Sequence, residues 1–261
     1  MLRSPRKDQV DWFDQVGWRW RFGWGPHAVR RLAPVSDVVV VVDVLRFTTA
    51  VDVAMAAGAL VFPYRWNDGT AADYATEQGA VLASKTLGPS DGSPWSLSPA
   101  SLASIPAGTR LVLPSPNGSA LCFGAAEAGA TAVFAACLRN ASAVAAAAAR
   151  AAGTDGVVGV VAAGERWNGP TGPLRPALED LLGAGAVLAA ADDASSLSPE
   201  ARSARAAFAA EADDLGATIA SCGSGIELAE RGGVDDLAWA SAHDVSAVAP
   251  RLDSPNFVDA S

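Results

Sequence analysis

Five consecutive valines at 38–42 constrain the fold of this chain more than any other segment. β-branched residues favour extended backbone, and a run that is apolar on both faces suits a strand buried in the middle of a parallel sheet. The run ends at Asp43, whose carboxylate must be solvated, paired or bound to a cation, because an isolated buried charge is very costly. We therefore predict a central strand with a polar site at its carboxyl end, where ligands gather in open α/β sheets.

Strand and helix patterns alternate along the rest of the chain. Further strands are predicted at 59–64, 81–84, 110–113, 131–136 and 156–163. Helices are predicted at 48–59, 71–80, 120–130, 141–152, 174–191 and 199–216, with another beginning near Ser224. This alternation implies βαβ units, so the predicted fold class is α/β, a three-layer α/β/α arrangement around a mostly parallel, possibly mixed, central sheet.

The first 34 residues differ in character from the rest. The segment 18–24 alternates large apolar and basic residues, which predicts a half-exposed strand with its aromatic side chains inward and Arg19 and Arg21 outward. We expect residues 1–34 to form this strand and a lead-in, packed on a phosphatase-like α/β domain of residues 35–261. An exposed strand of this kind is a candidate edge for self-association as a homodimer.

Overall charge and cysteine content limit the binding partners and the cellular compartment that we expect for this protein. A net charge of −9 argues against nucleic acid or an anionic membrane as the main partner, although interleaved Trp and Arg near the N-terminus could stack on single-stranded nucleic acid. Three cysteines without paired spacing favour free thiols in a reducing compartment. The N-terminus has no apolar signal-peptide core, and no apolar run reaches the ~20 residues of a membrane span. We therefore expect a cytoplasmic protein.

Polar side chains follow four of the predicted strands, at the points where these strands end. They are Asp43 and Arg46 with Thr48 and Thr49; Ser115, Asn117, Gly118 and Ser119; Arg139 and Asn140; and Glu165 and Arg166. A single exit of this kind is more often a capped helix or a surface ion pair. Convergence of the four at one edge of the sheet would place carboxylates beside guanidinium groups and helix N-termini, which bind anions.

Carboxylates that face anion-binding groups suit a phosphorylated or sulfonated substrate that a metal ion bridges to the acids. Hard oxygen ligands favour Mg²⁺ or Mn²⁺. A catalytic zinc site usually recruits histidines, and the two in this chain, His27 and His243, have no ligand spacing. The alternative from another class is a non-catalytic protein that binds a small anion, although several acids near an anion site favour a metal-bridged enzyme.

Residue types exclude several familiar mechanisms. Aspartyl-phosphate phosphatases of the haloacid dehalogenase type need a second Asp two residues after the nucleophile, where this chain has Leu45. A cysteine-based phosphatase needs an Arg six residues after its Cys, and after Cys122 and Cys137 that position holds an alanine. No P-loop occurs, and no Gly-x-Gly-x-x-Gly follows a strand. Cys137 remains an alternative nucleophile, because a helix N-terminus could lower its pKa.

The motifs together resemble those of a known family. They are Asp43-Val44-Leu45-Arg46 with Thr48-Thr49, Pro116-Asn117-Gly118-Ser119, Leu138-Arg139-Asn140-Ala141, Ala163-Gly164, Leu178-Glu179-Asp180 with Ala184-Gly185-Ala186, and Asp244, Ser246, Val248 and Pro250. In this order they cover most of the chain from about residue 35, and the sequence resembles the 2-phosphosulpholactate phosphatase family of coenzyme M biosynthesis. Phe47 departs from the pattern, since the family commonly has a small alanine there.

The resemblance implies a Mg²⁺-dependent phosphatase that acts on the phosphate ester of a small sulfonated or carboxylated hydroxy acid. The catalytic residues it implies are Asp43, Arg46 and Glu165, and the metal ligands are Asp43, Glu179 and Asp180, with Glu165 as a further candidate. The substrate-binding residues it implies are Thr48, Thr49, Ser115, Asn117, Gly118, Ser119, Arg139 and Asn140. In this hypothesis Arg46 and Arg139 bind the phosphate and the second anionic group.

Three alternatives stay open. A metal-activated water could attack phosphorus in line, or Asp43 could itself attack and form a phosphoaspartate. The substrate could be another small phosphorylated carboxylate. Glu179 and Asp180 could be ordinary acids in the first turn of a helix, where the helix dipole favours them.

Overall fold

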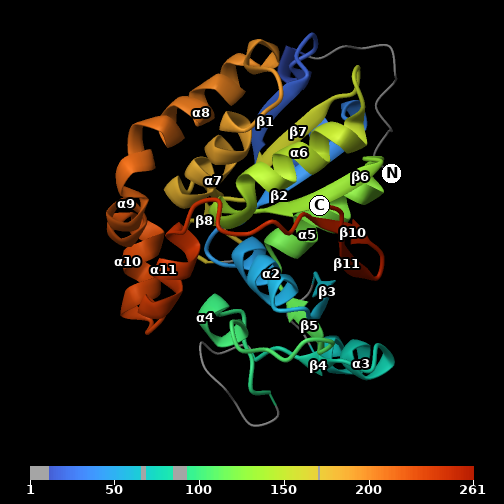
Figure 1. Ribbon diagram of the computed structural model, residues 1–261, viewed down its shortest axis with the longest axis vertical. Helices are drawn as coiled ribbons and strands as arrows, with labels where there is room; N and C mark the ends of the chain where they lie inside the picture. Colours follow the sequence, from blue (N-terminus) through green and yellow to red (C-terminus); the bar gives the residue numbers. More distant parts are fainter. Residues whose placement is uncertain (1–11, 66–68, 85–92, 170) are drawn as a thin grey trace.

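The five valines form strand β2 (Val38–Val42), and all five are fully buried. The computed structural model describes residues 12–65, 69–84, 93–169 and 171–261. In it, β2 lies inside a six-stranded sheet with the order β1-β7-β2-β6-β10-β11 (Figure 1). Strands β1, β7, β2 and β6 are parallel, and β10 and β11 are antiparallel. The structure confirms the predicted α/β class with a mostly parallel, mixed central sheet.

The bounds of the elements are as follows. The strands are β1 (Trp20–Trp24), β2 (Val38–Val42), β3 (Leu60–Tyr64), β4 (Val81–Leu82), β5 (Arg110–Pro114), β6 (Ala132–Ala136), β7 (Val158–Ala162), β8 (Glu165–Arg166), β9 (Leu174–Arg175), β10 (Pro250–Asp253) and β11 (Asn256–Asp259). The helices are α1 (Gly25–Leu32), α2 (Phe47–Ala56), α3 (Thr70–Glu77), α4 (Pro99–Leu102), α5 (Gly118–Glu127), α6 (Ala141–Ala152), α7 (Leu178–Ala189), α8 (Pro199–Glu211), α9 (Leu215–Ser221), α10 (Gly223–Glu230) and α11 (Val234–Ser241).

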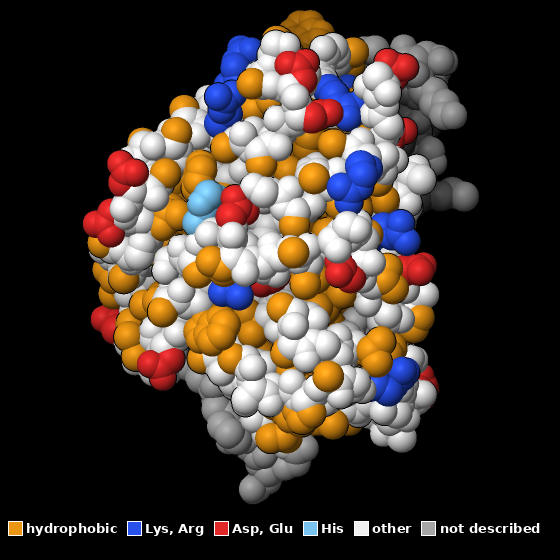
Figure 2. All heavy atoms as spheres, in the orientation of Figure 1, with side chains coloured by type: hydrophobic (Ala, Val, Ile, Leu, Met, Phe, Trp, Pro, Cys, Tyr) orange, Lys and Arg blue, Asp and Glu red, His pale blue; other side chains and the backbone are white. Residues whose placement is uncertain are grey.

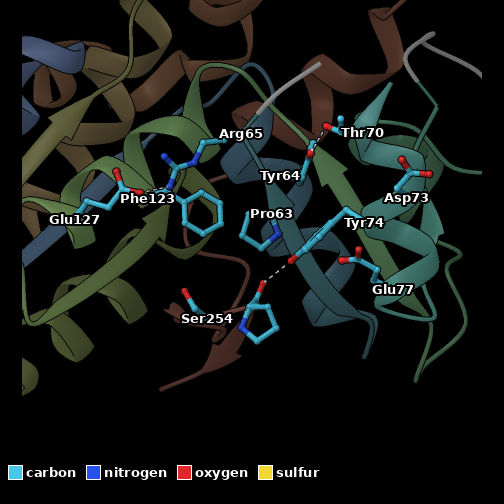
Figure 3. A pocket seen from close by; sticks show the side chains of 11 residues that line it. Pro63, Tyr64, Arg65, Thr70, Asp73, Tyr74, Glu77, Phe123, Glu127 and Ser254 are labelled. Atoms are coloured by element: carbon cyan, nitrogen blue, oxygen red, sulfur yellow. Dashed lines mark hydrogen bonds and ion pairs between the residues drawn. The ribbon is translucent and has the colours of Figure 1, made fainter. Parts of the chain in front are cut away.

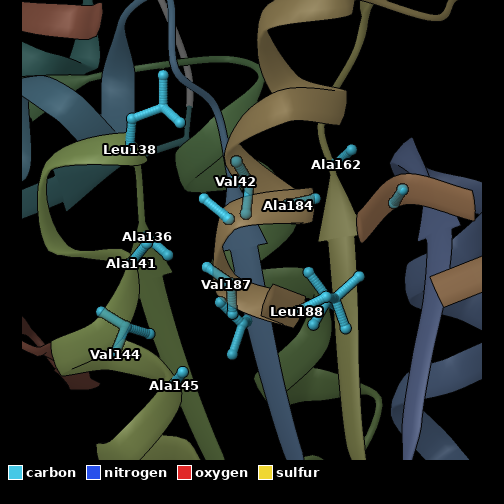
Figure 4. Close-up of a cluster of buried hydrophobic side chains, with 14 of the residues drawn as sticks. Val42, Ala136, Leu138, Ala141, Val144, Ala145, Ala162, Ala184, Val187 and Leu188 are labelled. Atoms are coloured by element: carbon cyan, nitrogen blue, oxygen red, sulfur yellow. The ribbon is translucent and has the colours of Figure 1, made fainter. Parts of the chain in front are cut away.

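The valine strand divides its side chains between two cores. Val38, Val40 and Val42 pack in one buried cluster, and Val39 and Val41 pack in a second, because successive residues of a strand point to opposite faces. Figure 4 shows the first cluster, in which Val42 lies among Ala184, Val187 and Leu188 of α7 and residues of α6. A strand that is apolar on both faces therefore lies between two helical layers.

Helices cover both faces of the main sheet. Helices α6 and α7 pack on one face, and α8 packs on the outer side of α7. Helices α1, α2 and α5 pack on the other face. Helices α8 to α11 continue along one side of the molecule toward the carboxyl ends of the parallel strands (Figure 1). This is the predicted three-layer arrangement.

A second sheet was not predicted. Strands β3, β5 and β4 leave the main sheet and form a parallel three-stranded sheet of their own, in the order β3-β5-β4. This small sheet lies with α3 below the main sheet in Figure 1. Periodicity identifies a buried strand but does not say which sheet it joins, so the exit of β5 comes from a different sheet than the exit of β2.

The N-terminal strand is shorter than predicted and differs on one face. Trp20 and Phe22 are buried as expected, but Arg21 is also buried, and its guanidinium donates hydrogen bonds to the backbone carbonyls of Trp18, Asp14 and Val35. These three carbonyls compensate the buried charge, so the expected outward orientation of Arg21 was wrong. The 196–198 segment covers the outer edge of β1 through two backbone hydrogen bonds. Homodimer formation stays a prediction.

Two further differences concern short elements. The helix predicted at 174–191 begins later, at Leu178, because Pro176 disfavours helical backbone at Arg175, which pairs in β9 instead. The C-terminal tail forms the β10–β11 hairpin, which extends the main sheet beside β6. Asn67 and Asp68 of the Asn-Asp-Gly turn signal, and the first part of the Gly-, Pro- and Ser-rich segment 87–108, which the sequence predicts to be a long loop, lie outside the described residues.

The cysteines and the helices bear on two further predictions. Cys122, Cys137 and Cys222 are free and buried, as expected. Burial raises the pKa of the Cys137 thiol, so the alternative of Cys137 as a nucleophile is not supported. Within the described ranges, no helix combines the length and the apolar character needed to cross a membrane.

Candidate active site

A pocket of about 610 Å³ opens at the carboxyl end of β2. The residues that line it are Asp43, Leu45, Arg46, Phe47, Leu97, Ser115, Pro116, Asn117, Glu165, Ser224, Glu227, Leu228 and Arg231. Five of them, Asp43, Arg46, Ser115, Asn117 and Glu165, were predicted from the sequence as site residues. The structure thus brings three of the four predicted strand exits together at one cavity, in the position where α/β folds bind ligands.

The hydroxyl groups of Thr48 and Thr49 fix the turn after β2 that carries Asp43. The Thr48 hydroxyl accepts the backbone N–H of Asp43 at 3.0 Å and donates to its carbonyl at 2.7 Å. The Thr49 hydroxyl donates to the carbonyl of Val44 at 2.7 Å. Both threonines are fully buried and neither lines the pocket. They therefore shape the loop that presents Asp43, whereas substrate contact by Thr48 and Thr49 stays a prediction.

Gly118 and Phe47 form a tight wall behind Asp43. A Cβ atom on Gly118 would lie 2.6 Å from Asp43 Oδ2 and 2.9 Å from Phe47 Cγ, distances that real Cβ atoms do not adopt. Phe47 is fully buried, and its ring centroid lies 6.3 Å from that of Phe257. The phenyl ring that departs from the family pattern is thus part of the wall, and only glycine fits against it at position 118.

The other residues of the β5 exit are mostly engaged with backbone groups. Ser115 Oγ accepts the N–H of Gly118 at 3.1 Å, and Asn117 Nδ2 donates to the Gly164 carbonyl at 2.7 Å. Ser119 is fully buried, and its hydroxyl donates to the carbonyls of Tyr64 at 2.7 Å and of Ser115. Ser115 and Asn117 reach the pocket, and Ser119 fixes the turn beneath them.

Asp180 connects the exits of two neighbouring strands. One carboxylate oxygen accepts the N–H of Val44 at 2.7 Å, and the other accepts the N–H of Gly164 at 2.8 Å. Asp180 is buried and does not line the pocket. Both of its oxygens are thus engaged by the backbone that carries Asp43 and Glu165, so the structure gives Asp180 a visible role other than the predicted metal ligand.

Two pocket carboxyl groups have raised pKa values. Burial raises the pKa of Asp43 to about 6, against hydrogen bonds from the N–H groups of Phe47 and Gly118 that lower it. Burial, together with the nearby charges of Asp43 and Glu179, raises the pKa of Glu165 to about 7. Acids that crowd one another favour protons or cations, and pKa values close to neutrality are typical of catalytic acids and bases.

Arg46 lines the pocket while pairing with a residue that the sequence did not single out as a site residue. Its guanidinium lies 3.0 Å from Asp236 Oδ2, and the Asp236 side chain is only 1% exposed. Asp236 also accepts the Ser98 hydroxyl and, at 3.2 Å, the N–H of Ala100. Asp236 on α11 thereby joins Arg46 to the start of α4. No sequence pattern predicts a contact across 190 residues.

The exit of β6 does not reach the pocket. Arg139 Nε lies 2.8 Å from Oδ2 of the fully buried Asp52, and its guanidinium stacks over Trp239 at 5.0 Å. Asn140 is fully buried, and its Oδ1 accepts the N–H of Cys137 at 2.8 Å. Neither residue lines the cavity, so their predicted contact with substrate is not supported by the geometry.

Glu179 is a buried neighbour of the site. It is 1% exposed, does not line the pocket, and lies 3.6 Å from Cys222 Sγ. Its charge raises the pKa of Asp43 and of Glu165, so it is within electrostatic reach of both. Glu179 contributes negative potential beneath the pocket.

The acids of the site can be tested against the coordination that Mg²⁺ prefers. Among the described residues, no group of three or more His, Cys, Asp and Glu side chains is arranged to hold a metal ion. Mg²⁺ is usually held by only one or two carboxylates, with waters and substrate phosphate completing its shell. Asp43 and Glu165 supply two such carboxylates in one pocket. These two carboxylates therefore suit a Mg²⁺ ion that keeps water and substrate oxygens as ligands. They are too few for a metal site built wholly from protein ligands.

Helix α10 supplies a wall that sequence reasoning missed. Three residues of α10, Ser224, Glu227 and Leu228, line the pocket together with Arg231, which follows the last residue of the helix. Their spacing, i, i+3, i+4 and i+7, is that of one helix face. This spacing was available in the sequence, but nothing in it indicated which helix covers the carboxyl end of β2.

A second pocket, of about 660 Å³, lies away from these residues, between α3, α5 and the β10–β11 turn (Figure 3). In it Tyr64 and Tyr74 stack at 4.9 Å, and Arg65 pairs with Glu127 at 2.5 Å and lies over Phe123. It contains none of the predicted site residues. The pocket beside Asp43 is therefore the candidate active site.

The charge on one face of the molecule is mixed. Figure 2 shows acidic and basic side chains interspersed among apolar and neutral surface on that face. This distribution differs from the continuous basic stripe typical of nucleic-acid-binding proteins.

Known proteins provide an independent comparison. A search of curated proteins found no match. The family model described as 2-phosphosulpholactate phosphatase matches residues 26–255, nearly the whole chain. The match includes every predicted site residue and confirms the resemblance seen in the sequence motifs. The chain belongs to the 2-phosphosulpholactate phosphatase family and is thus a phosphoric monoester hydrolase.

Proposed function

We propose that this enzyme hydrolyses the phosphate monoester of a small anionic hydroxy acid, of the 2-phosphosulpholactate type, and that it uses Mg²⁺. The observation that carries the proposal is that Asp43, Glu165 and Arg46 line one pocket. Two carboxyl groups with pKa values of about 6 and about 7 stand there beside a guanidinium group. A phosphate ester needs such a cation for its negative oxygens and such an acid for its leaving oxygen.

The residues of the pocket have separate roles in the proposed reaction. Arg46, oriented by Asp236, binds the phosphoryl oxygens. Glu165 holds a proton on part of the molecules at neutral pH, because its pKa is about 7, and donates this proton to the ester oxygen as the phosphorus–oxygen bond breaks. The oxygen that phosphorus gains comes from water, either directly or by hydrolysis of a phosphoaspartate, and the proton that this water loses replaces the one that Glu165 donated. The products are therefore phosphate and the free hydroxy acid.

Asp43 would hold the Mg²⁺ in this proposal, while Glu165, which carries the proton for the leaving oxygen, would stay outside the coordination shell of the ion. When bound, the ion supplies a lowered pKa for its water and neutralises charge on the phosphoryl group. Asp43 is ionised above a pH of about 6, so it can serve as a ligand or attack phosphorus itself. Rapid quenching of the reaction separates these routes, because only attack by Asp43 leaves a phosphoaspartate.

Phosphate release from 2-phosphosulpholactate and 2-phospholactate, with Mg²⁺ or with a chelator, tests the proposal. Wild type should release phosphate from at least one of them in a Mg²⁺-dependent manner. Asp43→Asn, which keeps the size of the side chain, should not. Tight binding without turnover under any divalent ion would instead support a small-anion-binding protein. A strong preference for the carboxylate substrate would favour a phosphatase of another phosphorylated carboxylate.

A further inference from the structure

The rim of the pocket is built by one face of α10. Ser224 and Leu228 on this face are buried at the floor, and Glu227 and Arg231 are exposed at the rim. Glu227 also contributes to the raised pKa of Glu165, which places its carboxylate within electrostatic reach of that group. Helix α10 thus places one acidic side chain, Glu227, and one basic side chain, Arg231, at the entrance of the pocket.

The cations near the site differ in how firmly they are held. Arg46 is paired with Asp236, which is buried, and Arg139 is paired with the buried Asp52. Moving either guanidinium away would leave a buried carboxylate without its partner, which is strongly unfavourable. Arg175 donates to Ser224 Oγ at 3.0 Å and does not line the pocket.

Arg231 is held loosely by comparison. Its partner is Glu227 at 2.6 Å, on the preceding helical turn, and the two side chains are 70% and 49% exposed. Exposed ion pairs of this spacing add little to stability, and both members keep water around them. An anion that enters the pocket can therefore take Arg231 from Glu227 without leaving a buried charge behind.

We infer that Arg231 binds the second anionic group of the substrate at the rim, while Arg46 binds the phosphate beside Asp43, and that Glu227 competes with the substrate for Arg231. This assignment rests on the proposed function, because it concerns the same substrate in the same pocket. It gives Arg231 a part of the anion binding that the hypothesis from the sequence assigned jointly to Arg46 and Arg139. Arg231 then selects for esters that carry a carboxylate or sulfonate next to the phosphate, and Glu227 sets how tightly they bind.

Two matched esters test the assignment. The carboxylate ester is 2-phospholactate. The methyl analogue is isopropyl phosphate, which keeps the phosphate group but has a methyl group in place of the carboxylate. For Arg231→Gln we expect KM for the carboxylate ester to rise roughly tenfold or more, the usual effect of losing one charge-assisted hydrogen bond, with kcat within about threefold of wild type. KM for isopropyl phosphate should not change. Arg231→Lys should restore part of the affinity.

Removal of the Glu227 charge should change KM in the opposite direction. Glu227→Gln frees Arg231 and should lower KM for the carboxylate ester severalfold. Glu230→Gln removes the same charge from the same helix but lies outside the pocket, so its kinetics should match wild type. A purely structural role of α10 would not produce opposite shifts from two neighbouring exposed residues.

The outcomes separate the two proposals. Equal effects of Arg231→Gln on both esters, or no effect on either, would overturn the assignment of Arg231 while the phosphatase activity stands. Absence of turnover by wild type would sink the proposed function. In that case calorimetric titration with the carboxylate ester replaces the kinetic assay, and the assignment still requires weaker binding by Arg231→Gln and tighter binding by Glu227→Gln.

Discussion

The carboxylate of Asp180 accepts the backbone N–H of Val44 at 2.7 Å, across 136 residues of sequence. Its second oxygen accepts the N–H of Gly164, which directly precedes Glu165. One buried side chain in the first turn of α7 therefore sets the relative positions of the two loops that carry Asp43 and Glu165. The site depends on this connection as much as on the groups that face the pocket.

Asp180→Asn should damage both stability and activity. The amide has a single acceptor oxygen, so its NH₂ group would face one of two backbone N–H donors. We expect a loss of about 1–3 kcal/mol in the free energy of unfolding, the cost of leaving a buried backbone N–H without an acceptor. Urea unfolding measures the loss, and kcat should fall with it. An Asn variant of wild-type stability would show that the backbone contacts are not needed.

Asp43 should make the metal-free protein less stable as the pH rises. Burial raises its pKa from 3.8 to about 6, so the native state binds this proton more tightly than the unfolded chain. The resulting stability is fully present below pH 3.8 and is lost as the pH rises through about 6. A tenfold difference in proton affinity between the two states corresponds to about 1.4 kcal/mol. Because Asp43→Asn cannot ionise, its free energy of unfolding should rise relative to that of wild type by up to about 3 kcal/mol at a pH of about 7.5.

Unfolding in urea at a pH of about 4 and again at about 7.5, with chelator present, checks this expectation. The difference between Asp43→Asn and wild type should be larger at the higher pH. A difference that stays constant between the two would mean that the pKa of Asp43 is not raised.

Glu165→Gln should lower kcat about 100-fold or more, the usual contribution of a general acid. The raised pKa of Glu165, about 7, also predicts that the kcat of wild type falls as the pH rises above about 7, since the donor loses its proton. The variant should lack this fall. A pH–rate profile measures both, and the same fall in the variant would assign the ionisation to another group.

Arg139 should matter for stability and not for substrate affinity. Arg139→Gln leaves the fully buried Asp52 without its partner and should cost about 3–5 kcal/mol, whereas the double change with Asp52→Asn should cost less than the sum of the single changes. KM should stay close to that of wild type. A raised KM at unchanged stability would instead support the contact between Arg139 and substrate that the sequence suggested.

Gly118→Ala should disturb the site, because the new methyl group would meet Asp43 Oδ2 at 2.6 Å. We expect the free energy of unfolding to fall by about 1–3 kcal/mol, the cost of overpacking, and kcat to fall as well. Gly124→Ala in the same helix is the matched control, since its Cβ would meet only Val29 Cγ1 at 3.5 Å. This control should gain roughly 0.5–1 kcal/mol from the higher helix propensity of alanine. Equal unfolding curves for the two variants would contradict the close packing at Gly118.

Local patterns predicted much of the candidate site. Asp43, Arg46 and Glu165 were found because polar groups at the end of an apolar strand are visible in the sequence, and parallel strands bring such ends together. Asp236, which pairs with Arg46 from α11, and Arg231, which lines the pocket at the end of α10, were missed as site residues because packing sets where these helices dock. The same limit explains why Arg139, although it follows a strand of the same sheet, turns toward Asp52 on α2 and away from the pocket.

The sequence by itself determined the α/β class, the buried central strand with its terminal carboxylate, and the motifs that place the chain in its family. These depend on residue type and period along a few residues of chain, which act locally. Only the tertiary structure decided that β3, β4 and β5 form a separate sheet, that Asp180 holds two backbone loops, and that α10 faces Asp43 with Glu227 and Arg231. These arrangements follow from which buried surfaces and charges find partners across stretches as long as 136 and 190 residues, and such pairings are settled by the packing of the whole molecule.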